Sequence, residues 1–129
     1  MNEAVKAVLR ANPWSLATSA GDLPNVVPIG MTCITEDDRL VLGDVMMKTS
    51  VENVQATGRA AVCAWDPKTG EGYQVKGRAS YETAGPLYDQ LHAAAVEKTK
   101  GAVHLKGVIV LTPEQTIVVT PGPDNKKVL

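Results

Sequence analysis

Residues 47–50, with the sequence Met-Lys-Thr-Ser, are the part of the chain best suited to bind a phosphate group. Thr49 is followed three residues later by Glu52, a spacing typical of a capping box, so we expect a helix over residues 49–57. The first turn of a helix presents unpaired N–H groups and the positive end of the helix dipole, and both attract anions. Lys48 adds a full positive charge there. A capped surface helix explains the same residues, because one Thr49 hydroxyl cannot fully serve both as cap and as ligand contact.

Two further segments could contact a ligand. Pro28 and Gly30 interrupt a strand-like stretch, and irregular backbone in a strand exposes amide and carbonyl groups, although a bend in a barrel explains them as well. If Val75 points into the core, Gln74 and Lys76 point to the opposite face of their strand. There Gln74 could exchange hydrogen bonds with a heterocycle, and ordinary alternation of solvent-facing polar residues explains it equally.

Other kinds of site find little support. His92 and His104 are far apart along the chain and lack companion ligands, so no metal site is expected. Cys33 and Cys63 match neither a CxxC motif nor a zinc spacing, and we interpret them as small buried thiols. A net charge of -1 gives no basic surface for nucleic acid. Without a signal-peptide pattern or an apolar run long enough to span a bilayer, the expected location is the cytoplasm.

The elements that must position these residues indicate a mainly β protein with one domain over residues 1–129. The chain has no Phe, so aliphatic side chains must fill its core, and the β-branched ones among them favour strands. Helices are expected over residues 2–11 and 49–57, and from Pro86 to just before Gly101. Strands are expected over residues 14–18, 25–35, 59–65 and 72–81, from Leu40 onward, and over 103–111 and 115–120 as a closing hairpin. Short strands joined by tight turns favour an antiparallel barrel with helices at its ends and a polar tail over residues 121–129.

In this order the segments resemble the FMN-binding split-barrel family, which includes pyridoxamine phosphate oxidase and small FMN-binding proteins. The similarity covers roughly residues 14–120. It rests on WSLATS from Trp14, LPNVVPIG from Leu23, MKTSVENV from Met47 and GYQVKGRA from Gly72. The resemblance implies a six-stranded antiparallel Greek-key split barrel with about three short helices. It also implies a homodimer that holds two FMN molecules at the subunit interface.

Carried onto this sequence, the family pattern implies a set of cofactor-binding residues: Pro28, Ile29, Gly30, Met47, Lys48, Thr49, Ser50, Asn53 and Gln74. Lys48 and Thr49 would hold the FMN phosphate, with Ser50 or Asn53 nearby. The segment from Pro28 to Gly30 would line the flavin, and Gln74 would contact the flavin or its side chain. Glycine at position 30 stands where a bulky aromatic can cover the ring in small FMN-binding proteins, and would leave the ring more open.

The expected function is that of an FMN-dependent oxidoreductase or electron-transfer protein, which exchanges electrons with a small molecule or a redox protein. No catalytic acid or base is identified. The extra basic residues and the C-terminal segment of true pyridoxamine phosphate oxidases are absent, so that activity is not expected. Two alternatives stay open: a split barrel that binds the deazaflavin F420, and a cofactor-free barrel that serves as a binding or structural module. Haem is disfavoured because neither histidine has an evident role as a ligand.

Overall fold

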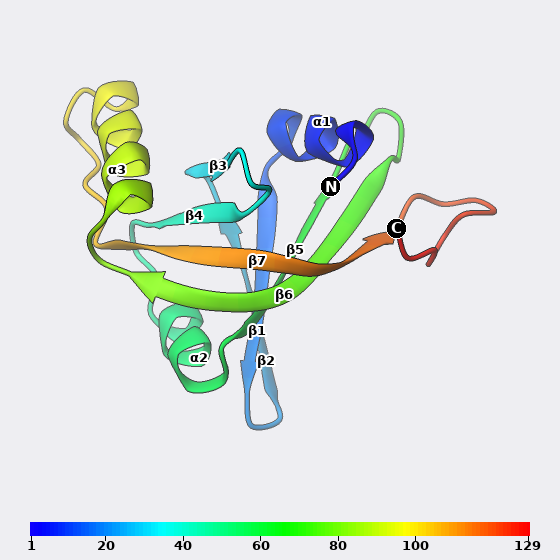
Figure 1. Ribbon diagram of the computed structural model, residues 1–129, viewed down its shortest axis with the longest axis horizontal. Helices are drawn as coiled ribbons and strands as arrows, with labels where there is room; N and C mark the ends of the chain where they lie inside the picture. The colour runs from blue at the N-terminus through cyan, green and yellow to red at the C-terminus, as the bar shows by residue number, and fades with distance from the viewer.

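A computed structural model describes residues 1–129 and shows three helices and one antiparallel sheet (Figure 1). The elements in chain order are α1 (Glu3–Ala11), β1 (Trp14–Ala20), β2 (Leu23–Ile29), β3 (Thr32–Ile34), β4 (Leu40–Asp44), α2 (Thr49–Thr57), β5 (Arg59–Trp65), β6 (Gly72–Glu82), α3 (Pro86–Lys98) and β7 (Gly107–Val118). The strand order is β2-β1-β5-β6-β7-β4-β3. The sheet curves into a half-barrel, which confirms the mainly β class with three helices and corrects the strand count from six to seven.

The additional strand arises near Gly30, where the stretch expected as one strand over residues 25–35 divides. β2 ends at Ile29 and pairs with β1, whereas β3 begins at Thr32 and pairs with β4. β2 and β3 are the two edge strands of the sheet, so the chain crosses from one edge to the other at Gly30 and Met31. The interruption seen in the sequence is therefore a crossing between edges and not a bulge inside one strand.

The expected closing hairpin is wrong, because β7 runs as one strand from Gly107 to Val118. It pairs with β6 along its length, and the register shifts between Lys76 and Gly77, opposite Pro113. Proline gives no N–H to a ladder, so a local irregularity can absorb it without turning the chain. Gly77 is required at this point, because a Cβ on it would lie 2.0 Å from the Thr112 carbonyl oxygen.

The concave side of the sheet holds the main core. Its buried side chains come from all parts of the sheet and include Trp14, Leu16, Leu40, Leu42, Val62, Val75, Ile109 and Leu111. Helix α1 contributes Val5, Val8 and Leu9, and helix α2 contributes Val54. Figure 1 shows α1 in the upper part of the view and α2 in the lower part, with the curved strands between them. Asn2 caps α1, and Gly58 ends α2 in the left-handed conformation with φ 66°, as expected from the sequence.

Helix α3 covers only part of the convex side. Its buried residues Leu91 and Ala95 pack with Val41 of β4 and with Val108 and Val110 of β7. Figure 1 accordingly shows α3 at one end of the sheet, away from β1, β2 and β5. The convex surface of those strands carries no helix. None of the three helices is long and apolar enough to cross a membrane.

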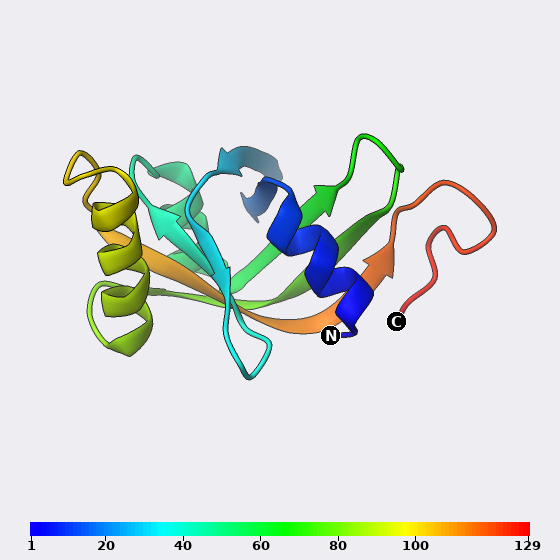
Figure 2. The ribbon, with the colours of Figure 1, turned by 90° about the horizontal axis from the view of Figure 1, so that it is seen from above.

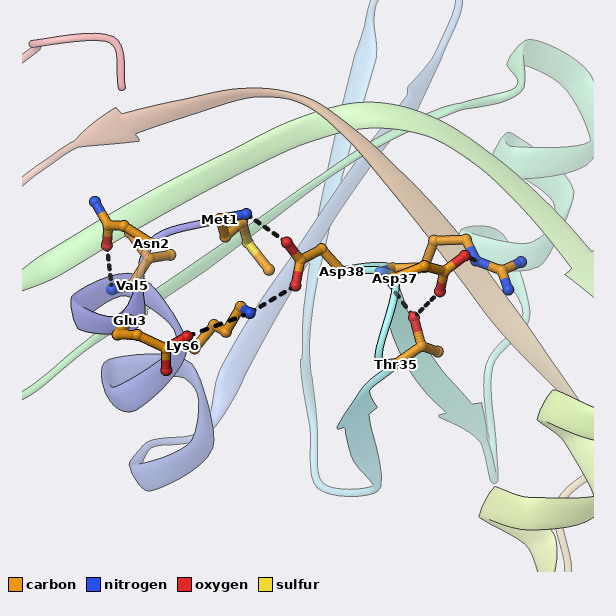
Figure 3. Close-up of polar contacts among 9 residues, drawn as sticks. Met1, Asn2, Glu3, Val5, Lys6, Thr35, Asp37 and Asp38 are labelled. Atoms are coloured by element: carbon orange, nitrogen blue, oxygen red, sulfur yellow. Dashed lines mark hydrogen bonds and ion pairs between the residues drawn. The ribbon is translucent and has the colours of Figure 1, made fainter.

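Ion pairs tie α1 to the turn between β3 and β4 (Figure 3). Lys6 Nζ lies 2.8 Å from Asp38 Oδ1, and the N-terminal ammonium of Met1 lies 2.6 Å from Asp38 Oδ2. Lys6 also lies 3.6 Å from Glu3 Oε1. The ammonium of Lys6 and then that of the N-terminus lower the pKa of Asp38 to about 2. The viewpoint of Figure 2 shows α1 lying across the open side of the sheet, where these pairs help to hold it.

We expect Asp38→Asn to lower the thermal unfolding midpoint at neutral pH. Because the folded-state pKa of Asp38 is depressed, its stabilising contribution is present above the unfolded value of about 3.9 and is lost as the pH falls towards about 2. The difference between wild type and variant should therefore shrink over that range. Melting curves from pH 7 to pH 2 measure it, with Asp22→Asn in the exposed β1–β2 turn as control. A difference that is constant with pH would contradict this role.

Candidate functional site

A groove of about 420 Å3 lies between the end of β2 and the segment that joins β4 to α2. It is the place where the structure gathers most of the residues proposed from the sequence. Those that line it are Pro28, Ile29, Gly30, Met47, Lys48, Thr49 and Ser50. Val27, Met31 and Val45 add apolar surface to its wall. Its volume lies in the range of small-molecule sites, and it combines an apolar wall with a polar, cationic end.

The polar end is the start of α2, and it differs from the expected capping box. Lys48 occupies the N-cap position with φ -137° and ψ -73°, and no side chain caps the helix. The helix therefore begins one residue earlier than the capping box requires, which places Thr49 inside the first turn. Its hydroxyl is not used as a cap, so the conflict between capping and ligand binding does not arise. N–H groups of the first turn, the Lys48 ammonium and the Thr49 hydroxyl together form a corner suited to an anion, the candidate anion-binding corner.

Two asparagines contact the residues around this corner in different ways. Asn25, which the sequence did not single out, lines the groove and donates from Nδ2 to Ser50 Oγ at 3.2 Å. Asn53 was expected near the ligand, but its Nδ2 donates to Thr18 Oγ1 at 3.1 Å inside the protein. Asn53 is buried and does not line the groove. We therefore interpret Asn53 as a residue that fastens α2 to β1.

Gln74 also lies outside the groove. Val75 is buried, so Gln74 faces the convex side of the sheet, as the alternation of the strand predicted. Cross-strand pairs place Pro28, Ser15, Cys63 and Gln74 in one row over four strands. Three strand spacings separate the two ends of this row, a distance of about 14 Å. Within one subunit, Gln74 is thus too far from Pro28 to share a small contact region with it.

A buried carboxylate that the sequence analysis missed supports the segment between β4 and α2. Asp44, the last residue of β4, is only 2% exposed. Its Oδ1 accepts the backbone N–H of Met47 at 2.8 Å, and its Oδ2 accepts the Tyr81 hydroxyl at 2.6 Å. Burial, followed by this bond to Asp44, raises the pKa of Tyr81. Lys106 lies 3.8 Å from Asp44 Oδ1 and donates to the Met47 carbonyl oxygen at 3.3 Å.

The two histidines are closer in space than their separation along the chain indicated. The rings of His92 and His104 have centroids 5.5 Å apart, and Tyr88 stacks on His92 with centroids 5.2 Å apart. Tyr88 and His92 lie on α3, His104 lies in the segment before β7, and none of the three lines the groove. No group of three or more His, Cys, Asp or Glu residues that could hold a metal ion is present.

The site geometry fits an elongated ligand with an anionic end and a planar apolar body. The corner at Lys48 suits the anion, and the wall formed by Val27, Ile29 and Met31 suits the body. A Cβ at Gly30 would meet no atom within 4 Å, so open space remains beside that residue. FMN has such a shape, with a phosphate at one end and an isoalloxazine ring at the other, and the residues present fit it.

Comparisons with known proteins agree with this geometry. Residues 1–121 match the family described as pyridoxamine 5'-phosphate oxidase. No curated protein matches the sequence. Among solved structures, HupZ of Group A Streptococcus is similar with a TM-score of 0.83 and 18% identity, covering 96% of this chain and 98% of that one. An FMN-binding protein of Syntrophomonas wolfei has a TM-score of 0.81 and 18% identity, covering 94% and 87% respectively.

A third similar structure, described as an F420 reductase, has a TM-score of 0.67 and 18% identity. The alignment covers 90% of this chain and 98% of that one. At these identities the structural similarities establish the fold, whereas the family match rests on the sequence.

Proposed function

This chain belongs to the pyridoxamine 5'-phosphate oxidase family, and from that membership we propose that it is a flavoprotein that binds FMN and transfers electrons. The observation that carries the proposal is the groove, in which an uncapped helix start and a lysine stand at one end of an apolar wall. The similarity to an FMN-binding protein over 94% of this chain supports the choice of ligand.

In the proposed complex, Lys48 pairs with the FMN phosphate, and the Thr49 hydroxyl and the free N–H groups of α2 donate to its oxygens. Ser50 accepts a hydrogen bond from Asn25, so its own hydroxyl hydrogen is free to donate. Met47 lines the groove beside Lys48, and Pro28, Ile29 and Gly30 line the ring. Asn53 supports the corner indirectly through its bond to Thr18.

FMN when bound would supply the redox chemistry, because its ring accepts and donates electrons whereas no side chain in the groove does. The protein binds and orients the ring and controls access to it. Gly30 leaves space beside the groove in this chain, and we propose that a small-molecule donor or a redox protein approaches there.

Oxidation of pyridoxamine phosphate is not proposed, because the basic residues expected for its substrate are absent. Free Cys33 and Cys63 are consistent with a cytoplasmic location.

We further propose that the protein acts as a homodimer through the convex surface of β2, β1 and β5. Val26 is 68% exposed and Trp65 is 56% exposed on this surface, and the small side chains of Ala17 and Ala61 lie between them. Monomeric proteins rarely leave a contiguous apolar surface of this kind on a sheet. Gln74 lies on the same face, so a second subunit packed here would bring its Gln74 towards the groove of the first.

An absorption spectrum of the purified protein, recorded before and after addition of excess FMN and removal of free flavin, tests the proposal. We expect a retained flavin spectrum, and FMN should be released when the protein is denatured. A protein that stays colourless after this treatment would refute FMN binding. The same experiment with F420 then distinguishes the deazaflavin alternative, which the similarity to an F420 reductase favours, from a cofactor-free barrel.

A further inference from the structure

The segment between β4 and α2 is held from two sides by residues that are remote in sequence. Asp44 Oδ1 accepts the N–H of Met47, and Lys106 Nζ donates to the carbonyl oxygen of the same residue. Met47 directly precedes Lys48, the N-cap of α2. Both polar backbone groups of the residue before the anion-binding corner are therefore fixed, one by a buried carboxylate and one by a lysine.

Lys106 places a second positive charge beside the corner. Its ammonium lies 3.3 Å from the Met47 carbonyl oxygen and 3.8 Å from Asp44 Oδ1, yet the side chain is still 58% exposed. Lys106 itself directly precedes β7, and the backbone N–H of Lys106 donates to the Asp44 carbonyl oxygen at 2.9 Å. The backbone N–H and the ammonium of Lys106 are thus both held, and the exposed side chain can still contact a further partner.

The carboxylate of Asp44 explains why this lysine is oriented towards the corner. Asp44 is 2% exposed and carries the only acidic side chain that pairs with Lys106. A buried carboxylate requires a compensating charge or several hydrogen-bond donors. Met47 N–H and the Tyr81 hydroxyl supply two donors, and Lys106 supplies the charge.

Lys106 is not among the residues that line the groove, but its ammonium contacts Met47, which is. We propose that Lys106 is a second phosphate-binding cation beside the groove and that Asp44 positions both Lys106 and the segment that carries Lys48. This inference rests on the proposed function, because it assigns residues to the phosphate of the same ligand. Lys48 is the only charged residue in the segment between β4 and α2, because residue 47 is an apolar methionine. Lys106 would therefore supply the second positive charge at the phosphate. The second charge comes from the start of β7, 58 residues further along the chain from Lys48.

Comparison of FMN with riboflavin tests the assignment, because the two ligands share the ring and differ in the phosphate. We expect Lys106→Gln to weaken FMN binding about ten-fold, since a charge-assisted hydrogen bond at a partly exposed site is lost. Its affinity for riboflavin should stay close to the wild-type value. Lys106→Arg should retain most of the FMN affinity, and Lys68→Gln in the exposed β5–β6 turn serves as the control.

Asp44 requires a separate variant, since its role is to position other groups. Asp44→Asn keeps an oxygen that can accept the Met47 N–H but removes the charge that holds Lys106. We expect this variant to lose FMN affinity, and in the double variant the two losses should add only in part, because part of the effect of Asp44 acts through Lys106. Thermal melting of each ligand-free variant separates loss of the fold from loss of the contact.

The outcomes distinguish the two proposals. If the wild-type protein binds neither FMN nor riboflavin, the proposed function fails and this assignment fails with it. If the wild type prefers FMN and Lys106→Gln shows the same preference, the assignment of Lys106 is overturned while the flavoprotein proposal stands. A selective loss of FMN affinity in Lys106→Gln, with full additivity in the double variant, would retain Lys106 and overturn the proposal that Asp44 positions it.

Discussion

Replacement of both Lys48 and Thr49 by alanine is expected to weaken FMN binding about 100-fold. The pair supplies one full charge and one hydroxyl donor to the proposed phosphate corner, and hydrogen bonds to charged groups contribute about 1.5–3 kcal/mol each. Because Lys48 is exposed, we expect a combined loss near the low end, about 3 kcal/mol. Fluorescence titration with FMN measures the change, and riboflavin affinity should change far less.

The chain offers a matched control in a second Lys-Thr pair. Lys68 and Thr69 lie in the exposed turn between β5 and β6, far from the groove. Alanine at both of these positions removes the same chemical groups, and the affinity for FMN should be unchanged. Equal titration curves for wild type and the Lys48/Thr49 variant would refute the assignment of the phosphate. A parallel fall in riboflavin affinity would instead indicate that the groove itself had been disturbed.

Local sequence signals correctly predicted the secondary structure around the candidate site. The limits of α2 follow from the polar start at residue 49 and from Gly58, and the strand alternation around Val75 correctly placed Gln74 on the outer face. Lys48 and Thr49 are adjacent in sequence and on one helix start, so their proximity needed no knowledge of the fold. The segment from Pro28 to Gly30 was recognised because proline and glycine interrupt a strand pattern.

The parts that depend on long-range pairing were not predicted. Asp44 and Lys106 come together only because β4 pairs with β7, a register that no local pattern specifies. The same is true of the single strand β7: Pro113 resembles a turn residue, and its place opposite Gly77 is visible only when β6 is beside it. Asn53 has the position expected of a ligand residue, but packing of α2 on β1 directs its amide towards Thr18.

Substitution of Val26 by aspartate is expected to convert the proposed homodimer into a monomer. Val26 faces the convex surface of the sheet in a row with Ala17 and Ala61, and a carboxylate there would have to lose its hydration without a partner. Light scattering should give about twice the 13.7 kDa chain mass for wild type and the single chain mass for the variant. Because Val26 is 68% exposed, the isolated subunit should keep its fold.

Leu23→Asp provides the control for this substitution. Leu23 is 76% exposed on the same strand, but strand alternation directs it to the face opposite that of Val26. An aspartate at position 23 should leave the dimer intact, whereas a non-specific effect of charge on β2 would disrupt both variants alike. If Gln74 reaches the flavin across the interface, the Val26→Asp monomer should also bind FMN more weakly. Wild type that is monomeric with full flavin occupancy would contradict the dimer and would require each groove to hold its ligand alone.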